Sequence, residues 1–190
     1  IITIFMIAFG VNFSFYYLLL TKNFYEAFHL EEVGAYLAII LCAGLAITWQ
    51  IEPRYGNFEE ALRVAYFQVG SIITTTGFST VDFDLWPSFS KTILVMLMII
   101  GACAGSTSGG LKCIRVLMVW KLTKTEFRQM LHPHAVLPVR INNTQITAQM
   151  GRTVFAFFVV YFILIMVACF FMVAMGHTLL DSFGLAISSF

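Results

Sequence analysis

Four long runs of apolar residues constrain how this chain can fold more than any other feature of its sequence. A helix that crosses the hydrocarbon core of a bilayer needs roughly 20 consecutive apolar residues. Runs near that length occupy residues 1–20, 33–50, 92 to beyond 101, and 153–175. Hydrophobic residues make up 59% of the 190 residues and charged residues only 11%, so too few polar side chains remain to cover a water-soluble particle. We therefore predict an all-α integral membrane protein that crosses the bilayer several times.

The distribution of basic residues predicts the orientation. Most of the Lys and Arg residues lie in one predicted loop, residues 111–152, where Glu126 is the only acid: Lys112, Arg115, Lys121, Lys124, Arg128, Arg140 and Arg152. Cytoplasmic loops carry such an excess, which places this loop in the cytoplasm and the acidic stretch 52–84 outside. Alternation then places the loop 21–32 in the cytoplasm, although its own charges do not support that side. The basic residues are not interleaved with base-stacking aromatic residues on a soluble face, so no nucleic-acid partner is expected.

Residues 58–87 lie between two predicted spans that must run in opposite directions. Residues 59–71 predict an amphipathic helix of about 20 Å, which is too short to cross a core of roughly 30 Å. Thr74, Thr75, Thr76, Gly77 and Phe78 follow it and form a poor helix, whose backbone groups cannot face lipid unsatisfied. We predict a re-entrant pore helix followed by a narrow loop. On this motif alone, a polar turn in an extracellular loop stays open as the alternative.

Such a narrow loop is suited to cations. Consecutive carbonyl oxygens can replace the hydration shell of a potassium ion, and Gly77 supplies the backbone freedom for this arrangement. The partial negative charge at the end of the pore helix lies close by, and Asp82 and Asp84 could concentrate cations at the mouth. The prediction is a filter that binds potassium, the transported ion, through residues 74–78. No other cofactor is expected.

A second irregular stretch interrupts the third apolar run toward its cytoplasmic end. Residues 101–110 are rich in glycine and small polar residues, a composition that breaks an α-helix. We predict a broken helix with a flexible loop that obstructs the pore below the filter and moves aside. The gate residues are Gly101, Gly105, Ser106, Thr107, Ser108, Gly109 and Gly110. Close packing of helices through small residues is the alternative.

Two short stretches of residues 105–112 resemble motifs of other protein classes but lack a defining residue. Residues 105–112 lack the ending of a phosphate-binding loop, because Leu111 separates Gly110 from Lys112. Residues 105–109 resemble a nucleophile elbow, but the central position is Thr107. We therefore predict that the protein is not an enzyme. A membrane scaffold or receptor, and with less support an intramembrane hydrolase, stay as alternatives.

Three motifs together resemble a known family. The stretches TTTGFSTVDFDLWP (74–87), GACAGSTSGGLKCIR (101–115) and HPHAVLPVRIN (132–142) occur in this order. On these motifs the chain resembles the TrkH/TrkG/KtrB family of potassium transporters, which are relatives of potassium channels. The greater similarity is to the TrkH and TrkG branch.

The resemblance implies an architecture of four helix–pore-loop–helix repeats around one pseudo-fourfold axis. On that template residues 1–32 hold the last helix of the second repeat and a cytoplasmic loop, and residues 33–128 are the complete third repeat. Residues 129–152 are a cytoplasmic linker, and residues 153–190 begin the fourth repeat with a helix and a pore helix. The chain starts without Met and stops inside an apolar segment, so we expect a fragment of a longer protein.

The resemblance also implies a function. Gly77 corresponds to the filter glycine of this repeat, Thr75 and Thr76 to its potassium contacts, and residues 101–110 to the family's gate. Family members take up potassium across the bacterial inner membrane, form homodimers and bind a cytoplasmic nucleotide-binding subunit of the TrkA or KtrA type. The basic stretch 112–152 could face that subunit. Channel-like passage and transport coupled to protons or sodium both stay open.

Overall fold

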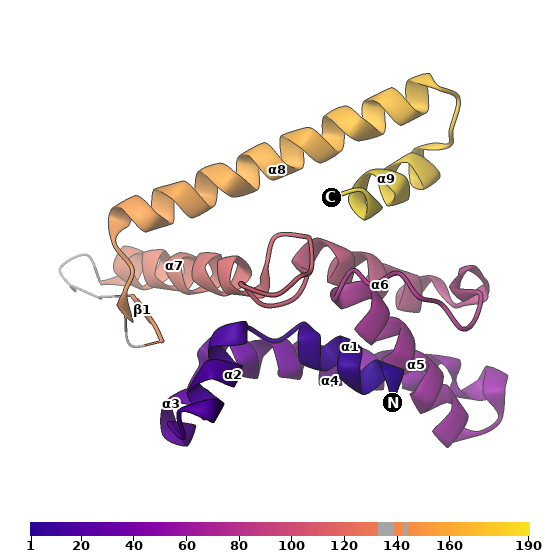
Figure 1. Ribbon diagram of the computed structural model, residues 1–190. Coiled ribbons are helices and arrows are strands. Elements are labelled where there is room, and N and C mark those ends of the chain that lie inside the picture. Colours follow the sequence, from indigo (N-terminus) through magenta and orange to yellow (C-terminus); the bar gives the residue numbers. More distant parts are fainter. Residues whose placement is uncertain (133–138, 143) are drawn as a thin grey trace.

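The structure, a computed structural model, describes residues 1–132, 139–142 and 144–190 and is dominated by helices (Figure 1). The α-helices are α1 (Ile2–Phe9), α2 (Phe13–Leu20), α3 (Phe24–Phe28), α4 (Glu31–Tyr55), α5 (Phe58–Ile73), α6 (Ser88–Ile100), α7 (Cys113–Leu131), α8 (Ala148–Ala174) and α9 (Leu179–Ser188). Two short strands, β1 (Arg140–Ile141) and β2 (Thr144–Gln145), pair antiparallel between α7 and α8. Positions 133–138 of the third quoted motif lie outside the described residues. The predicted all-helical fold is confirmed, with this hairpin as a small addition.

Two of the four expected spans are single long helices. By length and composition, α4 and α8 are able to cross a membrane. The third run is broken as predicted, because α6 ends at Ile100 and α7 begins only at Cys113. The prediction of one continuous helix over residues 1–20 is wrong. This run consists of α1 and α2, which are bent by 93° relative to one another.

Side-chain hydrogen bonds, from near and distant positions in the sequence, satisfy the backbone at the bend between α1 and α2. The side chain of Asn12 accepts a hydrogen bond from the backbone N–H of Ser14 at 2.8 Å and so caps the start of α2. At the end of α1, the hydroxyls of Tyr36 and Tyr16 donate to the carbonyls of Ile7 and Ala8 at 3.1 and 2.6 Å. These partners satisfy polar backbone groups that a helix end leaves open, so the run can turn without leaving them unpaired.

Helices α4 and α5 pack against each other and form the main core. The buried positions of α5 recur at the three- and four-residue spacing of one helix face, as in Ala61, Val64, Ala65, Gln68 and Val69. The core extends to α6 and to the loop that follows it. A second, smaller cluster joins α8 to α9. Most of the large apolar side chains along α8 are exposed, which is the expected pattern for a helix that faces lipid.

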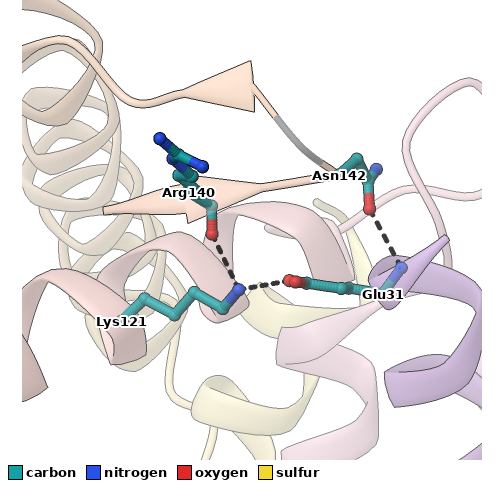
Figure 2. Close-up of polar contacts among 4 residues, drawn as sticks. All are labelled: Glu31, Lys121, Arg140 and Asn142. Atoms are coloured by element: carbon teal, nitrogen blue, oxygen red, sulfur yellow. Dashed lines mark hydrogen bonds and ion pairs between the residues drawn. The ribbon is translucent and has the colours of Figure 1, made fainter. Parts of the chain in front are cut away.

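The start of α4 lies against the segment between α7 and α8. The Glu31 carboxylate forms an ion pair with Lys121 of α7, and the Lys121 ammonium also donates to the Arg140 carbonyl at 2.8 Å (Figure 2). The Glu31 backbone N–H donates to the Asn142 side-chain oxygen at 2.9 Å. The acidic loop 21–32 and the basic loop 111–152 therefore meet at one end of the molecule, in agreement with the shared side predicted by alternation. Lys121 compensates the acidic charge that argued against this placement.

Candidate functional site

The predicted filter, residues 74–78 (the filter segment), directly follows the pore helix α5. Helix α5 extends the predicted helix by a residue or two at each end and stops at Ile73. The backbone N–H of Thr76 then donates to the Ser71 carbonyl at 2.9 Å, and that of Gly77 reaches the same carbonyl at 3.5 Å. The chain therefore turns sharply back on the last turn of the helix and continues without regular secondary structure. This is the re-entrant helix and narrow loop that the sequence predicted.

The hydroxyl groups of the three threonines are all engaged by protein groups. The Thr74 hydroxyl donates to the Gly70 carbonyl at 2.6 Å and lies 2.7 Å from the Thr76 hydroxyl. The Thr75 hydroxyl oxygen accepts a hydrogen bond from the Gly109 backbone N–H at 3.0 Å. The side chains are therefore used to hold the segment in place.

The carbonyl oxygens of the filter segment differ from these hydroxyl groups in their hydrogen bonding. Within residues 1–132, 139–142 and 144–190, no hydrogen bond is accepted by the main-chain carbonyl of any residue from 74 to 78. Residues 75–78 are exposed in this chain, so their carbonyl oxygens are open to a partner from outside it. Carbonyl oxygens are also the ligands that replace the hydration shell of a potassium ion in filters. The segment thus has free acceptors suited to a dehydrated cation.

Two residues of the segment have left-handed backbone conformations. Gly77 has a φ of +80° and open space around the position that a Cβ atom would occupy. Thr75 has a φ of +53°, which is uncommon for a β-branched residue. Such strain persists only where the surroundings impose it, and it clusters at functional sites. At Thr75, the hydrogen bond from Gly109 is one of the contacts that impose it.

The loop between α6 and α7 closes on itself. Its ends are joined by hydrogen bonds from the Leu111 N–H to the Ile99 carbonyl and from the Cys113 N–H to the Ala102 carbonyl, each 3.0 Å. Gly101 has a φ of +69°, and a Cβ atom there would lie 2.4 Å from the Gly109 carbonyl oxygen. Only glycine fits this close approach. The predicted gate residues, 101–110, therefore form one compact unit, which we call the intramembrane loop.

The side chain of Lys112, just after the loop, holds the second half of the loop in place. The Lys112 ammonium donates to the carbonyls of Ser106 and Ser108, and to the Ser108 hydroxyl at 3.3 Å. An ammonium group with its donors used in this way is a cation that clamps the loop and not a base that activates a nucleophile. In the part of the chain that the structure describes, no histidine or carboxylate bonds to the hydroxyls of Ser106 or Ser108. The contacts of Lys112 therefore give no support to the hydrolase alternative.

The filter segment and the intramembrane loop share two cavities. One cavity of about 280 Å³ is lined by Thr74, Thr76 and Thr107, together with α1. The other, of about 340 Å³, is lined by Thr75, Gly77 and Gly109, together with α6 and the end of α9. With the Thr75–Gly109 hydrogen bond, these cavities bring the two separately predicted sites together into one.

Three residues that contact the intramembrane loop were not identified from the sequence: Gly10, Asn12 and Glu32. The Cys103 N–H donates to the Gly10 carbonyl at 3.1 Å, and the Ala104 N–H donates to the Glu32 carboxylate. Asn12 also donates to Glu32, at 3.2 Å. The available signals were a Gly-x-Asn triplet inside an apolar run and an acid at the start of a span. Neither signal shows which segment the residue contacts.

The carboxylates predicted at the mouth lie outside the filter segment. Asp82 and Asp84, predicted at the mouth, lie in an exposed turn where the Asp82 side chain accepts the Asp84 N–H at 3.0 Å. Among the described residues, no group of three or more His, Cys, Asp or Glu side chains could hold a metal ion. That finding concerns side chains and does not test the predicted carbonyl contacts of Thr75 and Thr76.

Residues 54–190 match the sequence model of the TrkH family, described as cation transport proteins. The chain belongs to the TrkH family. It is 31% identical to the potassium uptake protein TrkH of Salmonella typhimurium over 181 residues, which are 93% of this chain and 37% of that protein. It is 36% identical to TrkH of Halomonas elongata, over 80% of this chain and 29% of that protein. It is 27% identical to TrkG of Escherichia coli, over 91% and 36%.

The structure supports the same family. The crystal structure of the potassium transporter TrkH from Vibrio parahaemolyticus superposes with a TM-score of 0.87 at 26% identity, over 98% of this chain and 41% of that chain. The chain thus spans well under half the length of the TrkH proteins it matches. The predicted resemblance and the predicted membrane fold are confirmed. A TrkH family chain belongs to a group of transporters and not of enzymes, as the sequence predicted.

Proposed function

We propose that the chain forms part of the pore-forming subunit of a Trk-type potassium uptake system. In this proposal the main-chain carbonyls of the filter segment bind dehydrated potassium, and the intramembrane loop controls its passage. Thr75 and Thr76 contribute carbonyl contacts to the ion, and Gly77 supplies the required backbone turn. Support comes from relatives that are named potassium uptake proteins, and from the geometry of this site.

One observation carries the proposal: the carbonyl oxygens of residues 74–78 accept no hydrogen bond from the described residues, whereas the threonine hydroxyls beside them are engaged. In such a segment the main-chain oxygens are available to a cation, whereas the side-chain hydroxyls are already used in hydrogen bonds within the protein. The C-terminal end of α5, where the helix dipole is negative, precedes the segment and favours a cation there. The scaffold alternative gives no reason for such an arrangement.

We further propose that this chain supplies one quarter of a fourfold filter. Residues 33–128 are the complete repeat, residues 1–32 and 153–190 belong to the repeats on either side, and residues 129–152 form the cytoplasmic linker.

The whole protein would lie in the bacterial inner membrane as a homodimer. Its regulatory nucleotide-binding subunit, of the TrkA or KtrA type, would face the basic stretch 112–152, where Lys124, Arg128 and Arg140 are exposed.

The test uses the full-length gene in a bacterial host that lacks its own potassium uptake systems. We expect growth at low potassium, together with uptake of rubidium as a tracer. A full-length protein that reaches the membrane but restores neither growth nor uptake, in the presence of its regulatory subunit, would contradict the proposal and favour a scaffold or receptor.

A further inference from the structure

Glu32, the second residue of α4, is a buried acid at a position where the proposed function gives it no role. Its exposed fraction is 2%, and among the described residues it is the only Asp, Glu, Lys or Arg side chain that is buried. A carboxylate taken out of water is costly unless it is paired or hydrogen-bonded. The position therefore calls for specific partners.

The partners of Glu32 come from two other segments. One carboxylate oxygen accepts the Ala104 backbone N–H, in the first half of the intramembrane loop. The other accepts the Asn12 side-chain amide at 3.2 Å, at the bend between α1 and α2. The orientation of the Asn12 amide is fixed, because its oxygen already accepts the Ser14 N–H. Next to these contacts, the Gly10 carbonyl accepts the Cys103 N–H.

Lys112 bonds to the second half of the loop, whereas Glu32 bonds to the first half. Ala104 precedes the residues of the loop that contact the filter segment. Both groups that point at the Glu32 side chain are donors, and each of its two oxygens accepts from one of them. Hydrogen bonds to a charged acceptor are also stronger than neutral ones. Displacing the loop from the filter would break this contact.

We propose that Glu32 is a positioning residue that holds the intramembrane loop in its obstructing place against the bend between α1 and α2. This inference rests on the proposed function of the loop as a gate. Weakening the contacts of Glu32 lowers the cost of moving the loop aside, while the filter segment is untouched. The consequence is a higher rate of ion passage at an unchanged preference for potassium over sodium.

The experiment measures potassium and sodium flux through the full-length protein in liposomes. Glu32→Gln replaces one acceptor by an NH₂ group that faces the Asn12 amide, so two donors oppose each other. We expect flux to rise about tenfold, because a hydrogen bond to a charged acceptor is replaced by a contact between two donors, with an unchanged ion ratio. Glu31→Gln is the matched control, because this neighbouring acid contacts Lys121 and not the loop. Its flux should stay within about twofold of wild type.

A swapped pair separates positioning from general damage. In Asn12→Asp with Glu32→Gln, the amide introduced on α4 can donate to the carboxylate introduced at the bend, which still accepts the Ser14 N–H. This double variant should return flux to within about threefold of wild type, whereas Asn12→Asp alone sets two carboxylates against each other and should raise flux. A purely structural role predicts that the double variant is the most damaged of the set.

The outcomes are distinct. If Glu32→Gln is folded and its flux is unchanged or lower, the inference is overturned. If it does not reach the membrane, Asn12→Ser tests the same contact, since serine keeps an acceptor for the cap on α2 and its shorter side chain lacks the amide group that reaches Glu32. Unchanged flux in Asn12→Ser also overturns the inference. Absent potassium flux in the wild-type protein contradicts the proposed function instead.

Discussion

The Thr75 side-chain oxygen accepts a hydrogen bond from the Gly109 backbone N–H at 3.0 Å, and so joins the filter segment directly to the intramembrane loop. The two residues lie 34 positions apart in the sequence. Because Thr75 also has a left-handed backbone conformation, the contact bears on the shape of the filter as well as on the position of the loop. A change in the conformation of one segment should therefore alter that of the other.

Removing this hydrogen bond should loosen the loop. Thr75→Val keeps the branched shape but loses the acceptor, and a typical hydrogen bond is worth about 1 kcal/mol, or about fivefold in an equilibrium. We expect higher potassium flux in liposomes for this variant. Thr75→Ser keeps the hydroxyl and is the matched control, with flux near wild type. Equal flux in the two variants would show that the bond does not restrain the loop.

Gly77 should determine ion preference. Its φ of +80° disfavours any side chain, while the space around it is open, so Gly77→Ser acts through backbone strain and not through a clash. We expect the ratio of potassium to sodium flux to fall about tenfold. Gly34→Ser is the control, since Gly34 lies in α4 with open space around the position that a Cβ atom would occupy. A Gly77→Ser protein with the wild-type ratio would argue against a filter at this position.

Shortening the intramembrane loop should raise flux. Deleting residues 105–108 removes the part between the Glu32 contact and the Gly109 contact, and leaves the hydrogen bonds of Leu111 and Cys113 that close the base of the loop. With less chain below the filter, we expect potassium flux well above wild type and little change in ion ratio. Reduced or unchanged flux in protein that elutes normally from a sizing column would rule out an obstructing role.

Gly101 should matter for stability. A Cβ atom there would lie 2.4 Å from the Gly109 carbonyl oxygen, and the positive φ adds backbone strain. We expect Gly101→Ala to cost about 3 kcal/mol and to lower the thermal unfolding midpoint in detergent. Gly34→Ala, in the interior of α4, should instead be neutral or stabilising by up to about 1 kcal/mol. An unfolding midpoint for Gly101→Ala equal to wild type would mean that the loop base has another conformation.

Local composition was sufficient to predict the two irregular segments. Several glycine, threonine or serine residues in close succession form a poor helix, so residues 74–78 and 101–110 were found without any structure. The bend between α1 and α2 was missed, because Gly10 and Asn12 interrupt the apolar run only slightly. Their effect depends on partners such as Tyr36, which is far away in the sequence.

The contacts that join these segments could not be predicted either. The Glu32 carboxylate and the Ala104 N–H are separated by 72 positions, and no local pattern in one sequence links them. The same holds for Lys121 and Glu31, 90 positions apart, whose charges suggested conflicting sides for their loops. Local patterns therefore predicted which segments matter, and the fold was needed to show how they contact one another.

The most direct measurement concerns the carbonyl oxygens of residues 74–78. Crystals of the full-length protein grown in rubidium would reveal bound ions by their anomalous scattering. We predict a peak in contact with main-chain oxygens of this segment, which disappears when rubidium is replaced by sodium. Anomalous peaks that lie only at carboxylates such as Asp82 and Asp84, with none beside the filter segment, would contradict ion binding by these carbonyl oxygens.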